Sequence, residues 1–322
     1  MYIGDTNDKL PANMSAVDAD YEVTICANCG KGEEESIKLK ACTACKMVKY
    51  CSRDCQIAHR PQHKKECKRR AAKLHDEKLF KQPPPLFGDC PICFVRLPTF
   101  DSGRKYMACC GKEICSGCVH TPQYDDQGNE VDNQKCSFCR TPFPSTEEAA
   151  AKTLNKRAEE YGDARAMYKI ALQYKKGSNE CPQDYTKALE LYHRTVELGF
   201  ACGPYHNIGY AYYLGLGVEV DKKKATHYWE LAAVAGSVQS RYNLGSMEVI
   251  VGNFDRALKH YMIAAKDGSS DAVGGIKDLY SNEFATKDDY TKALHAYQVY
   301  LGEIKSDQRD KAAAADEEYR YY

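Results

Sequence analysis

The spacing of the cysteines constrains this chain more than any other feature. Fifteen of its 17 cysteines lie between Cys26 and Cys139, and with His63 they make sixteen candidate ligands, enough for four tetrahedral sites with none left over. In chain order the pairs are Cys26 and Cys29, Cys42 and Cys45, Cys51 and Cys55, His63 and Cys67, Cys90 and Cys93, Cys109 and Cys110, Cys115 and Cys118, and Cys136 and Cys139. We therefore expect two small modules organised around metal, with four Zn²⁺ ions per chain.

A disulfide framework is the alternative use of so many cysteines. The first residues, MYIGDTNDKL, carry charge and no apolar stretch, so they do not resemble a secretory signal. Closely paired thiols in a reducing compartment favour metal over disulfides. No apolar run of 18 residues is present, which argues against a membrane partner. These features predict an intracellular protein, cytoplasmic or nuclear or both.

The charge is balanced, with 45 basic and 45 acidic residues, so no overall field draws the chain to nucleic acid. The basic residues are nevertheless concentrated near the N-terminus, above all in the stretch His63–Arg70, HKKECKRR. This patch has three possible interpretations: a solvated helix face, a contact for an acidic partner, or a weak nuclear-import signal. A nucleic-acid-binding function would rest on this patch alone.

The ligand pattern of residues 26–67 resembles a MYND finger, with its ending Cys51-x3-Cys55-x7-His63-x3-Cys67, Tyr50 before the third pair and Gln56 after Cys55. The resemblance implies cross-braced sites and a module that binds short proline-containing peptides or packs as a spacer. It places one zinc on Cys26, Cys29, Cys51 and Cys55, and the second on Cys42, Cys45, His63 and Cys67. Arg60 stands where the family usually has tryptophan, which turns an apolar groove wall into a cation. His59 falls outside the motif and is expected to be a surface histidine.

The second cysteine cluster reads CPIC, CCGKEICSGC and CSFCR, and it resembles the variant of the RING domain in which all eight ligands are cysteine. Lys112 occupies the slot where most RING domains have histidine, and the doubled Cys109-Cys110 restores the count. By analogy, Cys90, Cys93, Cys115 and Cys118 hold one zinc, and Cys109, Cys110, Cys136 and Cys139 hold the other. Gly111 could supply the kink that adjacent thiolates need, and His120 is a spare ligand.

A RING domain implies a role in ubiquitin transfer, in which the domain orients a charged ubiquitin-conjugating enzyme rather than doing covalent chemistry. Ile92 and Arg140 stand at positions that the family uses to contact the conjugating enzyme and ubiquitin, and Pro142 also fits. Ser137 replaces the usual proline of the last pair. The alternative is that Ile92 packs on its own zinc loops and the module is a scaffold, so no catalytic residue is predicted.

After Pro144 the composition changes and an internal repeat emerges. Four segments share the pattern of Asp or Asn, three residues, alanine, three residues and an aromatic; they begin at Asp184, Asp221, Asn253 and Asp289. The acid or amide is expected to cap a helix, and alanine and the aromatic to share its buried face. Gly199, Gly236 and Gly268 are expected to end the first three helices.

The repeat pattern, with the loop YLGLGVEVD before Asp221, resembles Sel1-like repeats, relatives of the tetratricopeptide family. The resemblance implies helix pairs stacked into a superhelix whose concave face binds proteins. The second repeat is close to the family pattern, and the third is five residues short. Cys181 and Cys202 are expected to be ordinary thiols.

The sequence thus predicts a mainly α chain: a C-terminal α-solenoid of about four helix pairs preceded by two small cross-braced zinc modules. The predicted parts are a disordered N-terminus (1–20), a MYND-type finger (21–70), a basic helix and proline-rich linker (71–89), a RING-like module (90–143), the helical repeats (150–305) and a charged tail (306–322), either a fraying helix or disordered. The expected function is a protein- or peptide-binding adaptor. The alternative is a RING-type ubiquitin ligase whose repeats select the substrate.

Overall fold

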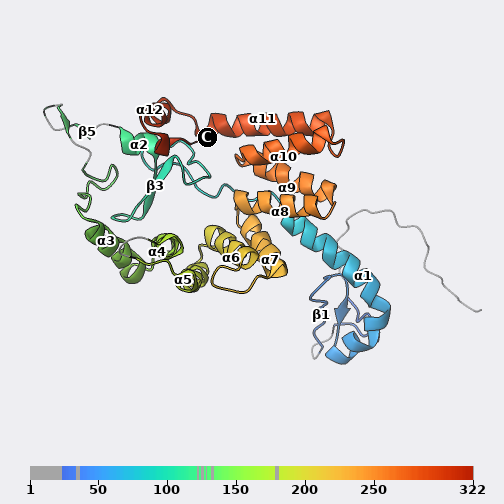
Figure 1. Ribbon diagram of the computed structural model, residues 1–322. Helices are drawn as coiled ribbons and strands as arrows, with labels where there is room; N and C mark the ends of the chain where they lie inside the picture. Colours follow the sequence, from blue (N-terminus) through green and yellow to red (C-terminus); the bar gives the residue numbers. More distant parts are fainter. Residues whose placement is uncertain are drawn as a thin grey trace, which may run out of the picture. The chain divides into compact units, whose positions relative to one another are not determined.

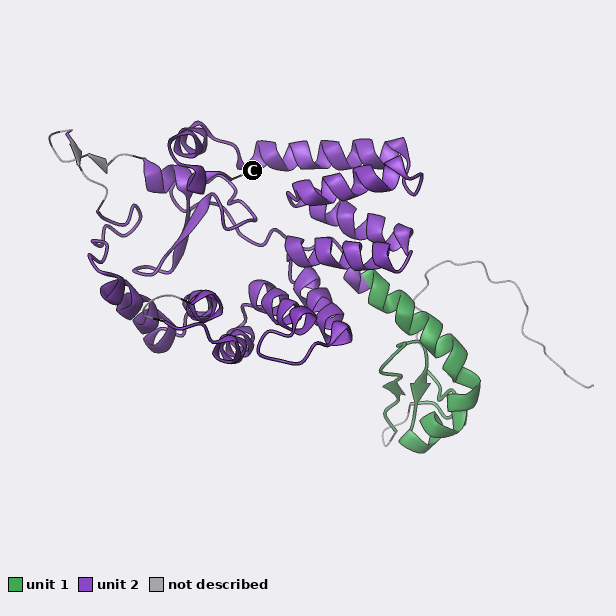
Figure 2. Ribbon diagram, in the orientation of Figure 1, with its two compact units in different colours: residues 1–77 green, residues 78–322 purple. Residues whose placement is uncertain are grey.

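The computed structural model describes residues 24–33, 37–121, 123–124, 127, 129–131, 134–177 and 181–321. The expected disordered segment 1–20 lies outside them. The chain divides into two compact units, Met1–Glu77 and Lys78–Tyr322 (Figure 2). Each unit is described by itself.

Unit 1 consists of a small antiparallel pair of strands and one long helix. Strand β1 (Lys40–Ala41) pairs with β2 (Lys49–Tyr50), and helix α1 runs over Arg53–Leu79, its last two residues belonging to unit 2. The sequence predicted a basic helix that extends from the finger; in the structure this helix is continuous with the one that carries His63 and Cys67. It continues through Pro61, which leaves the carbonyl of Ile57 without its usual N–H partner.

The zinc-module part of unit 2 is organised around a hairpin and a short helix. Strand β3 (Arg104–Met107) pairs antiparallel with β4 (Lys112–Cys115), helix α2 follows at Ser116–His120, and β5 (Gln123–Tyr124) pairs with β6 (Glu130–Val131). Its core combines ligand cysteines with a few apolar side chains: Phe87, Leu97, Met107, Ile114 and Val119. A core this small is typical of a fold stabilised by metal.

The rest of unit 2 is helical (Figure 1). A leading helix α3 (Glu147–Glu160) is followed by four pairs: α4 (Ala164–Lys176) with α5 (Tyr185–Glu197), α6 (Cys202–Leu214) with α7 (Lys222–Val234), α8 (Val238–Ile250) with α9 (Phe254–Lys266), and α10 (Ser270–Ser281) with α11 (Lys287–Ile304). The predicted mainly α fold with about four helix pairs is confirmed. Among the described residues, no helix combines the length and apolarity needed to cross a membrane.

The repeat pattern explains how these pairs pack. The four repeat alanines, Ala188, Ala225, Ala257 and Ala293, are all buried. So are the aromatics four residues after the first three, Tyr192, Trp229 and Tyr261. In the fourth repeat the buried aromatic is Tyr300 rather than Tyr297, which is half-buried.

Close approach of the helices depends on glycine. A Cβ on Gly209 would lie 2.6 Å from the Trp229 ring, and a Cβ on Gly245 would lie 2.5 Å from the Tyr261 ring. The helix-ending glycines Gly199, Gly236 and Gly268 all have positive φ, as predicted.

The helix caps agree with the prediction in two repeats and differ in two. Asp184 and Asp221 accept backbone N–H groups at the start of α5 and α7. Asn253 makes no such bond; its amide nitrogen donates to Glu248. Asp289 is not a cap but the third residue of α11, where it forms a capping box with Thr286.

The C-terminal tail is an ordered helix, α12 (Asp307–Ala315), followed by a 3-10 turn at Glu317–Tyr319. Helix α12 packs on α2 of the zinc module: a Cβ on Gly117 would lie 2.7 Å from the backbone nitrogen of Arg309. Figure 1 shows α12 beside α2. Of the two alternatives predicted for the tail, the helix is present, but it is packed rather than fraying, because Arg309 and Ala312 are buried.

Candidate metal centres

The structure brings the sixteen candidate ligands together in four groups, in each of which all ligand atoms lie within 4.8 Å of one another. These four groups are the ones that the resemblance to cross-braced zinc fingers implies. Two groups lie in unit 1: Cys26, Cys29, Cys51 and Cys55; and Cys42, Cys45, His63 and Cys67. Two lie in unit 2: Cys90, Cys93, Cys115 and Cys118; and Cys109, Cys110, Cys136 and Cys139.

Five of the C-x2-C or C-C pairs are followed directly by a residue with a left-handed backbone: Gly30, Lys46, Phe94, Gly111 and Arg140. Lys46, Phe94 and Arg140 follow the second cysteine of their pairs with φ of 58°, 58° and 61°, although none is glycine. The N–H of each donates to the carbonyl of the pair's first cysteine, at 2.9 to 3.0 Å. This turn aims both thiols to one side, and the strain of a left-handed non-glycine residue indicates that the turn is built for a shared ligand.

Gly111 makes the corresponding turn at the doubled cysteine, with φ of 70°. Its N–H donates to the carbonyl of Met107 at 2.7 Å. The sequence predicted this kink. His120 and Lys112 lie outside the ligand group: the His120 ring packs near Tyr319, and the Lys112 ammonium lies 5.9 Å from the ring of Phe138.

In unit 1, the second group mixes three thiols with one imidazole. His63 Nε2 lies 3.3 Å from Cys45 Sγ, so the ring presents this nitrogen to the cluster. His59 stacks on His63 with centroids 5.6 Å apart, and its Nδ1 lies 3.1 Å from the hydroxyl of Tyr50. His59 lies outside the ligand group, as expected, but it is half-buried rather than fully exposed, and it supports the ligand ring from behind, one helical turn away.

The thiols within one metal group have different pKa values. Burial raises the pKa of Cys26, but backbone N–H groups of Cys29 and Cys51 outweigh it and hold that pKa at about 6. The pKa of Cys51, in the same group, rises to about 12 because its thiol hydrogen-bonds to Cys29. In unit 2 the Thr141 hydroxyl, 3.2 Å from Cys139 Sγ, helps hold the pKa of Cys139 at about 6. A metal would have to displace the remaining protons.

The donor sets fit zinc. Four soft sulfur or imidazole donors converging without a carboxylate are typical of structural, tetrahedral Zn²⁺ sites that leave no open position. Zinc there would supply folding energy rather than chemistry, since neither module is large enough to fold by burial alone.

Beside each metal group of unit 2 lies an arginine that the sequence patterns did not predict. Arg157 of α3 donates from Nη2 to the carbonyl of Cys110 at 3.0 Å. Arg309 of α12 donates to the carbonyls of Val95 and Arg96, at 3.1 and 2.7 Å, just beyond Cys93. A group of four thiolates with one zinc would carry about −2, which the guanidinium of Arg309 is placed to offset in part; the charge of Arg157 is already paired with Asp163. The distance of the two arginines along the chain hides them from any motif.

The residues expected to contact a conjugating enzyme are accessible. Ile92 lies in the turn between Cys90 and Cys93 and is 36% exposed, and Phe94 beside it is 76% exposed. Arg140 and Pro142 are both exposed.

Two pockets are relevant to partner binding. The first, in unit 1, has a volume of about 400 Å³ and borders the second metal group. We call it the MYND groove; it is lined by Cys42, Thr43, Ala44, Tyr50, Arg53, Gln56, Ile57, Arg60, His63, Lys64, Cys67 and Lys68.

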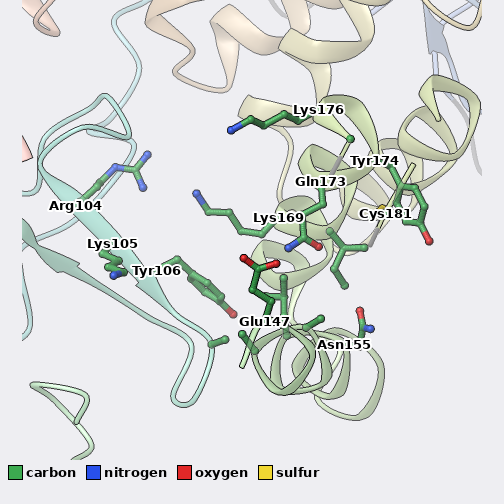
Figure 3. A pocket seen from close by; sticks show the side chains of 16 residues that line it. Arg104, Lys105, Tyr106, Glu147, Asn155, Lys169, Gln173, Tyr174, Lys176 and Cys181 are labelled. Atoms are coloured by element: carbon green, nitrogen blue, oxygen red, sulfur yellow. The ribbon is translucent and has the colours of Figure 1, made fainter. Parts of the chain in front are cut away.

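The second pocket, of about 760 Å³, lies between β3 and helices α3 and α4 (Figure 3). Lys169 extends into it from α4, facing Arg104 of β3. Both cations pair with Asp101, at 3.7 and 2.5 Å, and Arg104 also pairs with Glu113. Because these charges are compensated within the protein, we assign this pocket no ligand.

Comparison with protein families identifies two parts of the chain. Residues 26–67 match the MYND finger, and residues 164–200, 205–237 and 239–269 match the Sel1 repeat. The predicted MYND and Sel1 modules are therefore confirmed. The RING-like resemblance of residues 90–139 stays a prediction, supported by the two ligand groups that the structure forms there.

Individual relatives are similar over one module at a time. Protein sel-1 homolog 2 of Mus musculus is 28% identical over 140 residues, which is 42% of this chain and 20% of that protein. SET domain and MYND-type zinc finger protein 6 of Schizosaccharomyces pombe is 50% identical over 40 residues, 12% of this chain and 8% of that protein. The chain thus spans a fifth or less of the length of these relatives.

Among solved structures, a Sel1 repeat protein from Oxalobacter formigenes is 25% identical, with a TM-score of 0.42, over 54% of this chain and 67% of that one. The protective antigen c5321 of uropathogenic Escherichia coli is 24% identical, with a TM-score of 0.40, over 51% of this chain and 35% of that one.

Proposed function

We propose that this chain is an intracellular, zinc-stabilised adaptor whose MYND finger recruits a partner through an acidic segment that also carries an apolar residue. The MYND finger and the Sel1 repeats both support a protein-interaction role. The observation that carries the proposal is the composition of the MYND groove.

Four cations and no carboxylate line the MYND groove: Arg53, Arg60, Lys64 and Lys68. They recur on one face of α1 at spacings of seven, four and four residues, which places them in a row. Within the described residues, none of the four forms an ion pair. A row of cations with no carboxylate partner attracts an acidic partner and speeds its association.

Ile57 and Tyr50 supply the apolar part of the same groove. Ile57 is 58% exposed although it lies on the cationic face of α1, and Tyr50 is buried behind it. Arg60, which stands where the finger family usually has tryptophan, is thus part of the groove wall. Its guanidinium can stack on a flat side chain or pair with a carboxylate, so the substitution changes the preferred ligand rather than closing the groove.

Fluorescence anisotropy with the full-length, zinc-loaded chain tests this proposal. The probes are labelled ten-residue peptides with a central Pro-x-Leu, flanked either by aspartate and glutamate or by lysine. We expect the acidic peptide to bind and the lysine peptide to bind at least tenfold more weakly.

Variants of neighbouring lysines supply the matched comparison. Lys64→Glu, inside the groove, should abolish most of the binding, whereas Lys65→Glu changes the same charge at an exposed residue outside the groove lining and should have a small effect. Equal losses in both variants, together with competition by duplex DNA at low salt, would instead favour the nucleic-acid reading of the basic patch. Equal binding of both peptides would contradict the proposal.

A second candidate function, a RING-type ubiquitin ligase, is favoured by the exposure of Ile92 and Arg140. Discharge of ubiquitin from a panel of charged conjugating enzymes by the full chain would support it, provided that Ile92→Ala and Arg140→Ala both abolish the activity. No discharge from zinc-loaded protein would leave the module as a scaffold.

A further inference from the structure

The first helices of the four repeat pairs carry a ring at the same position, except the last. The fifth residue is Tyr168 in α4, His206 in α6 and Tyr242 in α8, but Gly274 in α10. Two of these rings reach the next first helix: Tyr168 lies against Gly203 of α6, and His206 Nδ1 lies 2.9 Å from the Ser240 hydroxyl in α8. In α10 this position has no ring.

Gly274 has no packing reason to be glycine. A Cβ there would meet no atom within 4 Å, whereas a Cβ on the neighbouring Gly275 would lie 2.8 Å from the Tyr261 ring. Glycine is unfavourable inside a helix relative to alanine. At position 275 the Tyr261 ring leaves no room for a side chain, which accounts for that glycine. At Gly274 the helix backbone is instead exposed without a neighbouring side chain.

The open backbone forms the floor of a groove of about 520 Å³, which we call the Gly274 groove. Its apolar walls come from three helices and one connection: Tyr242 and Val249 of α8, Phe254 and Tyr261 of α9, Leu279 of α10, and Phe284. Phe284 stacks on Phe254 with centroids 3.6 Å apart and remains 46% exposed.

The only charged residues in the lining are two aspartates, Asp271 and Asp278. They lie three residues before and four residues after Gly274, so both are on its face of α10, about 10 Å apart along the helix axis. Neither carboxylate forms an ion pair with another described residue. Asp271 is accounted for by its place in the first turn of α10, where a negative charge is favourable. Asp278 is not accounted for in this way, because it lies in the last turn, where the helix dipole disfavours a negative charge.

We propose that the Gly274 groove binds a partner segment through an inserted arginine flanked by apolar residues. The aliphatic stem of the arginine would lie over Gly274, in the place of the missing ring. Its guanidinium would pair with Asp278 or Asp271 and face the ring of Tyr242. Arginine matches aromatic walls with an acidic rim better than lysine does, because its planar guanidinium can stack on a ring and pair with a carboxylate at the same time. The site is independent of the MYND groove, which has the opposite charge.

Anisotropy with the full-length, zinc-loaded chain tests the proposal. The probe is a labelled nine-residue peptide with a central arginine between two leucines, compared with peptides that carry glutamine or glutamate at the centre. We expect the arginine peptide to bind, the glutamine peptide to bind roughly tenfold more weakly, and the glutamate peptide to bind more weakly still. Equal affinity for the arginine and glutamine peptides, or no binding of the arginine peptide at low salt, would overturn the proposal.

Two pairs of variants localise the binding. Gly274→Tyr fills the groove and should weaken the arginine peptide at least tenfold, whereas Gly302→Ala, in α11 where a Cβ also meets nothing within 4 Å, should not. Asp278→Asn should weaken it severalfold, and Glu197→Gln on the exposed face of α5 should not. Because the new tyrosine enters open space, the thermal stability of the Gly274→Tyr variant should not fall below that of wild type. Unchanged binding by Gly274→Tyr would overturn the proposal, and Lys64→Glu in the MYND groove should leave this peptide's affinity unchanged.

Discussion

Arg309 of α12 donates from Nη1 to the backbone oxygen of Arg96 at 2.7 Å, joining the last helix of the chain to the turn that follows Cys93. The same nitrogen also donates to the carbonyl of Ile304 at 2.5 Å, and Nη2 donates to Val95. The arginine is 0% exposed. A buried guanidinium that satisfies three carbonyls holds the zinc module against the end of the helical repeats.

Replacing this arginine should detach α12. In Arg309→Met the three carbonyls lose their donor, and we expect a loss of about 3 kcal/mol in the local stability of α2 and α12. Hydrogen exchange of amides in the zinc-loaded full chain measures it. Arg320→Met is the control, because Arg320 is exposed and pairs with the exposed Glu317; its effect should stay below about 0.5 kcal/mol. Equal protection of α12 in both variants would show that Arg309 does not anchor it.

Removal of zinc should also release α12. Chelation removes the ions that order the turn after Cys93, so the carbonyls of Val95 and Arg96 no longer present a fixed site to Arg309. We expect α12 to lose protection from hydrogen exchange together with both zinc modules, while α5–α10 stay protected.

The metal content supplies the companion measurement. Elemental analysis should find four zinc ions per chain, matching the four ligand groups. Two or three ions would mean that the doubled-cysteine group or one of the MYND groups does not bind metal. If α12 keeps its protection after all zinc is gone, the coupling between metal and helix is absent.

Stability should fall in mild acid through His206. Burial, and then the charge of Lys175, lower its pKa from 6.5 to about 4. In the unfolded chain, His206 is therefore protonated below about pH 6.5, whereas in the folded protein it is protonated only below about pH 4. The resulting loss begins below pH 6.5 and reaches about 3 kcal/mol near pH 4.

The difference between wild type and His206→Asn isolates this contribution from that of the zinc ligands, which also titrate in acid. Urea unfolding followed by Trp229 fluorescence at pH 7.5, 6 and 5 should show the variant losing less stability than wild type over this range. Parallel curves for the two proteins would mean that His206 is not the responsible group.

Gly209 should tolerate no side chain. A Cβ would lie 2.6 Å from the Trp229 ring and 3.1 Å from the carbonyl of Ala225, so Gly209→Ala forces the ring to move. We expect a net destabilisation of about 1–3 kcal/mol from overpacking, despite the better helix propensity of alanine. Gly302→Ala, with open space around it, should instead gain about 0.5–1 kcal/mol. Thermal unfolding monitored by Trp229 fluorescence compares the two, and a stabilised Gly209→Ala would contradict the packing.

Local chemistry made the repeats and the ligand sets accessible to sequence reasoning. The helix-capping Asp184 and Asp221, the buried alanines and the terminating glycines all act within one or two helical turns, so their spacing carries their roles. Where a side chain had several local partners, spacing was insufficient. Asn253 donates to Glu248 instead of capping α9, and Thr286 takes the capping role expected of Asp289.

The sequence by itself therefore determined the MYND finger, the Sel1 repeats and the sixteen candidate ligands, because thiol pairs and helical periodicity are short-range patterns. The grouping of the ligands into four cross-braced sets was implied by the resemblance to known fingers. The tertiary structure alone decided how the zinc module of unit 2 is held. Tyr106 donates to Asp163 and Arg157 reaches Cys110 at one end of the repeats, while Arg309 reaches Val95 and Arg96 at the other. These contacts join residues from about 50 to more than 200 positions apart, and a buried cation finds its acceptors only when the whole chain has folded.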